Sequence, residues 1–212
     1  MASAVIHMTV ASEINKVLKR DYDKLIIGSI APDISKIIGE TKLRSHFLVT
    51  EENNNNIPNI DVFLSAYKEY LYDDFVMGYF IHLYTDYLWF KYFIPEIYDK
   101  ISIKKLDGTV IKCTKEMAST YIYNDYTNLN IDLIDKYELN LKIFYGELPK
   151  IDPIITEIPM NRLDLLIEKM GLIIKNTKIN KSYVFDLENI DSFIKMSIEL
   201  TLAKIKEIEN EK

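Results

Sequence analysis

The chain has 212 residues, of which 48% are hydrophobic and 27% charged, a balance typical of globular proteins with a sizeable core. Its formal net charge of −6 argues against a general nucleic-acid-binding protein, which usually carries a basic excess, so we expect no specific nucleic-acid partner. The single cysteine, Cys113, excludes an internal disulfide and a zinc site built from cysteines.

The first part of the chain predicts one helix and one polar loop. Residues 1–16 contain no basic segment followed by a long apolar one, so we expect no signal peptide and a cytoplasmic location. Apolar residues at helical spacing over residues 10–18 predict a helix that begins near His7. Residues 51–58 are polar and rich in asparagine, and we expect a solvent-exposed, mobile loop there.

The next two helices are also indicated by apolar spacing. One covers residues 62–71, with Asn59 or Asp61 as a suitable N-cap. The other lies in the apolar run 75–93, which is long enough to span a bilayer. Asp86 interrupts this run, however, and an aspartate at mid-bilayer costs roughly 2.5–3.5 kcal/mol. We therefore expect a buried central helix and no transmembrane segment.

The second half of the chain predicts helices that follow a short β-hairpin. The hairpin is indicated by β-rich flanks around the turn Asp107-Gly108. Residues 115–137 look partly helical.

The last two helices are a short one over residues 163–170 that ends at Gly171, and a long one over residues 190–205. No internal repeat or convincing linker separates these segments. The sequence therefore predicts one mainly α-helical domain over residues 1–212, with a small hairpin insertion.

The helix predicted over the apolar run carries two potential metal ligands. His82 and Asp86 are four residues apart, so on a helix they lie on one face with their Cβ atoms about 6 Å apart. An imidazole and a carboxylate in this arrangement can bind one metal ion. A carboxylate in an aromatic-rich helix is also expensive to bury unless it is paired or coordinates a metal.

The chain contains three histidines, and each has an ordinary explanation when taken alone. His7 could be a packed core residue, His46 a surface loop residue, and His82 a buried donor to a backbone carbonyl. Asp33, in "GSIAPD", could be an N-cap or turn residue. Together with Asp86, however, they place five imidazoles and carboxylates in apolar or tight-turn contexts early in the chain. Ligands without a thiolate suit zinc, and also iron(II) or manganese(II).

Four segments in this order, "IHMTVASEINK", "IIGSIAPDISK", "SHF" and "MGYFIHLYTDYLWF", resemble the zinc-dependent phospholipase C family. That family includes, more distantly, the fungal single-strand-specific nucleases. The similarity covers roughly residues 1–95, and the rest of the chain matches only in being helical. It implies a helical bundle of the phospholipase C type, with a zinc cluster in a cleft that hydrolyses phosphodiesters.

The resemblance also implies roles for individual residues. Asp33, His46, His82 and Asp86 correspond to one complete four-ligand metal site, in which Asp33 lies beside the attacking water and is the candidate base. His7 would bind a neighbouring metal, and Asp86 would bridge the two ions.

Two departures from the family reduce the expected number of metals. The family's neighbouring site uses the amino group and carbonyl of an N-terminal tryptophan exposed by processing, whereas this chain begins Met1-Ala2. The family's third metal uses two further histidines, but no histidine follows His82. We therefore expect one or two ions.

An additional ligand could come from the second half of the chain. Asp125 in "YNDY" is the best candidate, with Asn124 behind it and Glu96 weaker. The expected function is a metal-dependent hydrolase that uses a metal-activated water on a small phosphodiester, phosphate ester or lipid-like substrate. The alternatives are a metal enzyme of other chemistry on the same scaffold, and a non-catalytic domain whose metal is structural.

Overall fold

The computed structural model of the chain describes residues 2–48, 57–177 and 181–211. These residues form a mainly helical structure with one two-stranded antiparallel sheet, as the sequence predicts. The elements are α1 (Ala4–Leu18), α2 (Tyr22–Ile30), η1 (Ala31–Asp33), α3 (Ile34–Ile37), α4 (Ile60–Tyr67), η2 (Lys68–Tyr70), α5 (Asp74–Leu88), η3 (Trp89–Phe93), α6 (Ile94–Ile97), β1 (Ser102–Lys104), β2 (Val110–Lys112), α7 (Lys115–Asn128), α8 (Asn130–Lys136), η4 (Lys142–Phe144), η5 (Met160–Arg162), α9 (Leu163–Lys175) and α10 (Leu187–Asn210). Most of the loop expected at 51–58 lies outside the described residues.

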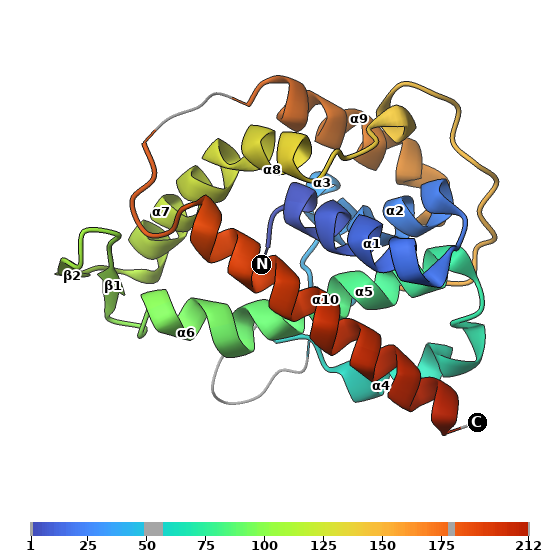
Figure 1. Cartoon of the computed structure of the whole chain (residues 1–212). Coiled ribbons are helices and arrows are strands. Elements are labelled where there is room, and N and C mark those ends of the chain that lie inside the picture. Colours follow the sequence, from blue (N-terminus) through green and yellow to red (C-terminus); the bar gives the residue numbers. More distant parts are fainter. Residues whose placement is uncertain (1, 49–56, 178–180, 212) are drawn as a thin grey trace.

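Helix α5 lies at the centre of this arrangement, between α1 and α2 on one side and α4 on the other (Figure 1). The long helix α10 runs across α1 and α5, while the hairpin β1–β2 projects at one end of the molecule. Most side chains of α5 are buried, which confirms the expected central helix. Among the helices of the described residues, none is both long and apolar enough to cross a membrane.

Two glycines allow α5 and α2 to pack at very short distance. A Cβ atom on Gly28 of α2 would lie 2.1 Å from the carbonyl oxygen of Phe75, and one on Gly78 of α5 would lie 2.1 Å from that of Leu25. Since non-bonded carbon and oxygen atoms cannot approach so closely, only glycine fits at either position. This crossing brings the end of α2 beside the middle of α5, where His82 lies.

Capping residues explain where two of the predicted helices begin. The first starts at Ala4, before the expected position near His7, because the Ser3 hydroxyl accepts a hydrogen bond from the backbone of Ile6. The helix predicted at 62–71 starts at Ile60, and of the two proposed N-caps Asn59 is the one used. After Tyr67 it continues as the 3₁₀ turn η2.

In the second half, the prediction that a helix ends at Gly171 is wrong. Helix α9 continues to Lys175, because Gly171 lies inside the helix against the Phe144 side chain and has no positive φ. Residues 115–137 form two helices, α7 and α8. The expected hairpin is confirmed, with Ile103 paired to Ile111 and Gly108 at a φ of 83°.

Candidate metal centre

Five of the six proposed ligands come together in the core, although they come from four separate segments. His7 comes from α1, Asp33 from the 3₁₀ turn η1, His46 from the segment before α4, and His82 and Asp86 from α5. The three imidazoles and Asp86 are fully buried, while Asp33 is 6% exposed. The helix α5 presents His82 and Asp86 on one face, as their spacing predicts.

The distances within this cluster are those of neighbouring ligand atoms. Asp86 Oδ2 lies 3.7 Å from Nε2 of both His46 and His82, and Asp86 Oδ1 lies 3.4 Å from Nε2 of His7. Asp33 Oδ1 lies 3.7 Å from His46 Nε2. Two sets of three have ligand atoms within 4.8 Å of one another: His7, Asp33 and His82, and His46, His82 and Asp86. This grouping shares His82, whereas the resemblance implied that Asp86 is the shared ligand.

The tautomer of His82 follows from its backbone partner. Its Nδ1 lies 2.7 Å from the carbonyl oxygen of Ser29, which can only accept a hydrogen bond. A neutral His82 therefore carries its proton on Nδ1 and directs the lone pair of Nε2 into the cluster. This second contact of a ligand imidazole is a usual feature of metal sites, because it fixes both ring orientation and tautomer. The close α2–α5 crossing places Ser29 within reach.

His46 and His7 complete a compact group of rings. His46 Nδ1 lies 2.9 Å from the Ser45 hydroxyl, and His46 Nε2 lies 3.2 Å from His82 Nε2. Two imidazole nitrogens on one tetrahedral zinc would be about 3.3 Å apart, given Zn–N distances of about 2.0–2.1 Å. The His7 ring stacks on that of His82 at a centroid distance of 3.7 Å.

The environment keeps the cluster in the protonation states that bind cations. Burial lowers the pKa of His46 to about 4, and burial together with the adjacent His7 lowers the pKa of His82 well below its usual value. Burial alone would raise the pKa of Asp86, but the His7 imidazole outweighs it and holds this pKa below the usual range. At neutral pH the cluster therefore offers the neutral imidazoles of His46 and His82 and the ionised carboxylate of Asp86.

Several buried atoms of the cluster have no hydrogen-bond partner among the described residues. They are both ring nitrogens of His7 and Oδ2 of Asp86. Leaving such atoms unsatisfied costs about 1–3 kcal/mol each, and more for a charged group, so a native site usually supplies a partner. Imidazole nitrogens and carboxylate oxygens are ligands for divalent transition metals. The buried group of His7, Asp33, His46, His82 and Asp86 could therefore hold a metal ion.

Three contacts around the cluster were not predicted from the sequence. The backbone N–H of Ala2 donates to Asp86 Oδ1 over 2.9 Å, and the Lys42 ammonium donates to Asp33 Oδ1. The third is the Ser29 carbonyl, which contacts His82 through its backbone, so no side-chain pattern could identify it. The sequence offered one signal for the Lys42 contact: this charged residue precedes the candidate ligand His46 by four positions.

Asp125, the sixth proposed ligand, does not belong to either group of ligand atoms. Its buried carboxylate instead accepts hydrogen bonds from the backbone N–H groups of Tyr183, Val184 and Phe185, and from the Asn124 side chain. These contacts fix the segment that leads into α10. Asn124 is occupied in the same contact, and Glu96 is exposed. The prediction that Asp125 supplies an additional metal ligand is therefore corrected. Its carboxylate binds backbone N–H groups instead.

This assignment predicts the behaviour of Asp125→Asn. The amide retains one oxygen acceptor but directs an NH₂ group at backbone donors, so stability is expected to fall by about 2–3 kcal/mol. Metal content and its response to chelator are expected to stay those of the unmodified chain. Thermal melting and elemental analysis check both points, and a loss of bound metal in the folded variant would return Asp125 to the ligand set.

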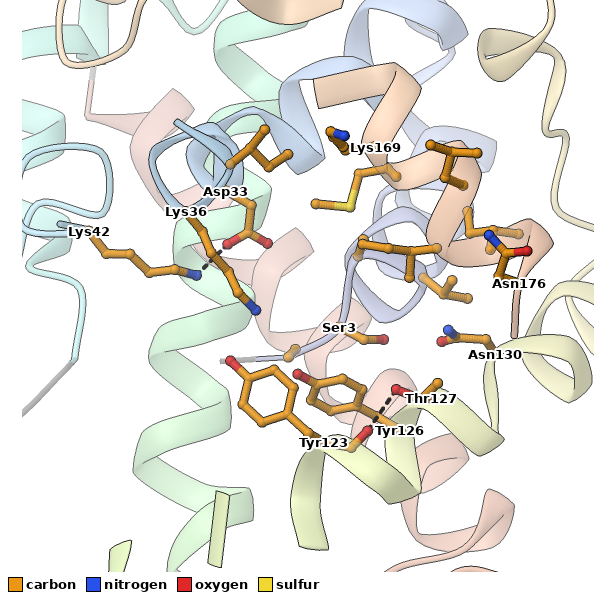
Figure 2. A pocket seen from close by; sticks show the side chains of 18 residues that line it. Ser3, Asp33, Lys36, Lys42, Tyr123, Tyr126, Thr127, Asn130, Lys169 and Asn176 are labelled. Atoms are coloured by element: carbon orange, nitrogen blue, oxygen red, sulfur yellow. Dashed lines mark hydrogen bonds and ion pairs between the residues drawn. The ribbon is translucent and has the colours of Figure 1, made fainter. Parts of the chain in front are cut away.

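The cluster adjoins a cavity of about 530 Å³ between η1, α3, α7 and α9. Figure 2 shows Asp33 at its wall with the Lys42 ammonium directed toward it. Ala2, which contacts Asp86, also lines this cavity. The cluster therefore reaches the cavity through Asp33, and Asp86 contacts a second lining residue, Ala2.

Comparison of the chain with models of protein families, with curated proteins and with solved structures finds no match. The relationship to the zinc-dependent phospholipase C family therefore stays an expectation carried by the sequence motifs.

Proposed function

We propose that this protein is a metal-dependent hydrolase that cleaves a phosphodiester or phosphate ester with a metal-activated water. The observation that carries the proposal is the buried cluster of three imidazoles and two carboxylates beside a cavity, in which the ring nitrogens of His7 have no hydrogen-bond partner among the described residues. His7, Asp33, His46, His82 and Asp86 would hold one or two ions, zinc first, with iron or manganese as alternatives. When bound, such an ion lowers the pKa of water toward about 7 and polarises a phosphoryl oxygen.

Asp33 is assigned the role of base because of its position. It is the one cluster residue that lines the cavity, so its carboxylate can contact both the metal site and a substrate. Burial would raise its pKa, but the Lys42 ammonium and the nearby imidazoles hold that pKa below its usual value. Asp33 is thus ionised at neutral pH, and can accept a hydrogen bond from the attacking water and orient it.

Lys42 supports the same reaction from the cavity side. Its ammonium pairs with Asp33, so it holds that carboxylate in place and adds positive charge where a phosphoryl group would enter. The single Cys113 fits a reducing compartment, and we include a cytoplasmic location in the proposal.

The alternatives differ in measurable ways. A structural metal is typically enclosed by four protein ligands, whereas here the cavity reaches Asp33, which favours an accessible site. Other metal chemistry on the same scaffold would show as bound iron or manganese without phosphodiesterase activity.

The test is hydrolysis of bis(p-nitrophenyl) phosphate by protein stripped with chelator and then reloaded with zinc, iron(II) or manganese(II). We expect turnover after reloading with at least one metal, none in the stripped protein, and a loss of at least about 100-fold in kcat for Asp33→Asn. Lys175→Gln, a change at an exposed residue of α9 that does not line the cavity, is the matched control. A correctly folded, fully metal-loaded protein that cleaves neither this diester nor p-nitrophenyl phosphate would contradict the proposal.

A further inference from the structure

The charge of the cavity lining is opposite to that of the whole protein. The chain carries a net charge of −6, yet the charged residues that line the cavity are three lysines and one aspartate: Lys36, Lys42, Lys169 and Asp33. Figure 2 shows Lys36 directed toward Tyr123 across the cavity, and Lys169 on the neighbouring helix α9. The cavity is therefore a local region of positive charge, which attracts anionic ligands.

Two of these lysines have no carboxylate partner among the residues that the structure describes. Lys42 pairs with Asp33, but within the described parts of the chain neither Lys36 nor Lys169 forms an ion pair. The Lys36 ammonium lies 4.7 Å from the centre of the Tyr123 ring, and this contact directs the side chain without neutralising its charge. Two positive charges at the cavity are thus left for a ligand.

The number of lysines that line the cavity indicates how many negative charges the substrate carries. A simple phosphodiester carries one negative charge, which a metal held by the cluster would face together with Lys42. Lys36 and Lys169 come from α3 and α9, two elements that pack against each other, and both residues line the cavity. Their two ammonium groups suit a second anionic group on the same substrate molecule.

We propose that Lys36 and Lys169 form an anion subsite, and that the substrate carries a second phosphate or carboxylate besides the ester that is cleaved. This proposal rests on the proposed hydrolase function and adds the substrate class to it. Both lysines are exposed residues of the cavity lining, so each contributes modestly and through attraction that salt can screen.

The test compares three p-nitrophenyl phosphodiesters whose second ester arm is neutral (ethyl), cationic (choline) or anionic (2-carboxyethyl). The unmodified protein is expected to show its highest kcat/KM with the anionic arm. The double variant Lys36→Gln/Lys169→Gln is expected to lose about 10-fold in kcat/KM on that substrate, mainly through KM, and less than about 2-fold on the neutral one. Salt at about 1 M, which shortens the screening length to about 3 Å, should remove the same preference.

Lys175→Gln removes one positive charge from the same helix outside the cavity lining and is expected to change none of these ratios. If Lys175→Gln lowered the preference for the anionic arm as much as the double variant does, that preference would depend only on the net charge of the protein. Such a result would overturn the subsite. Equal loss on all three substrates in the double variant would overturn it as well.

A binding measurement separates this proposal from the hydrolase proposal. Calorimetry with phosphoglycolate, which has a phosphate and a carboxylate, is expected to show tighter binding than with methyl phosphate, and the difference should vanish in Lys36→Gln/Lys169→Gln. That result without cleavage of any diester or of p-nitrophenyl phosphate would support the subsite and contradict the hydrolase. Equal affinity for both probes in the unmodified protein would contradict the subsite whatever the enzyme cleaves.

Discussion

Asp86→Asn is expected to remove most of the bound metal and, with it, phosphoester hydrolysis. The substitution keeps the size of the side chain and the oxygen that accepts the Ala2 N–H, but it removes the charge that attracts a cation. Because a metal present at about 100 times its dissociation constant stabilises the folded state by about 2.7 kcal/mol, the metal-bound protein should melt clearly higher than the variant. His82→Ala should lose metal in the same way, since both ligands lie on one face of α5.

Chelator should reverse the order of stability. Without metal, Asp86 is a fully buried carboxylate with one oxygen unpartnered among the described residues, so neutralising it is expected to leave stability unchanged or to raise it. Asp125→Asn is the matched control, because Asp125 is equally buried but fully hydrogen-bonded, and it should destabilise with and without chelator alike. Full metal occupancy in both Asp86→Asn and His82→Ala would show that α5 carries no ligands.

Gly78→Ala is expected to destabilise the fold by about 3 kcal/mol or more. Its new methyl group would lie 2.1 Å from the Leu25 carbonyl oxygen, a backbone atom that cannot rotate away, so α2 and α5 would have to separate. Gly28→Ala should behave alike, because its methyl group meets the Phe75 carbonyl at the same distance. Urea unfolding of each variant measures the change.

Separation of these helices should also weaken metal binding in any variant that still folds. The Ser29 carbonyl would withdraw from His82 Nδ1, and loss of such a second contact typically lowers metal affinity about 10–100-fold. Gly146→Ala is the control, since its added methyl group meets only ordinary contact distances and the residue is exposed. Native stability in Gly78→Ala would show that the α2–α5 crossing is looser than described here.

The sequence predicted the helices whose signals are local. Apolar spacing found α1, α4, α5 and α10, and the turn Asp107-Gly108 found the hairpin. The sequence did not predict features that depend on contacts between separate segments of the fold. Gly171 is a common helix-ending residue, yet packing against Phe144 keeps it inside α9. The short segments α2, η1 and α3 were not predicted.

The candidate ligands show the same difference between local sequence signals and features that depend on the fold. His82 and Asp86 could be paired from their spacing on one helix, and the ordered motifs added His7, Asp33 and His46. Asp125 looked similar, because a buried carboxylate needs a partner whether that partner is a cation or a row of backbone N–H groups.

Elemental analysis of the chain purified without chelator tests metal binding most directly. We predict at least one equivalent of a divalent transition metal per chain, zinc first, because the buried imidazoles and carboxylates leave ring nitrogens and a carboxylate oxygen without partners among the described residues. The metal should leave on dialysis against chelator and return on reloading. A content well under one equivalent, with no uptake of zinc, iron(II) or manganese(II) by the folded protein, would show that the cluster does not bind a metal.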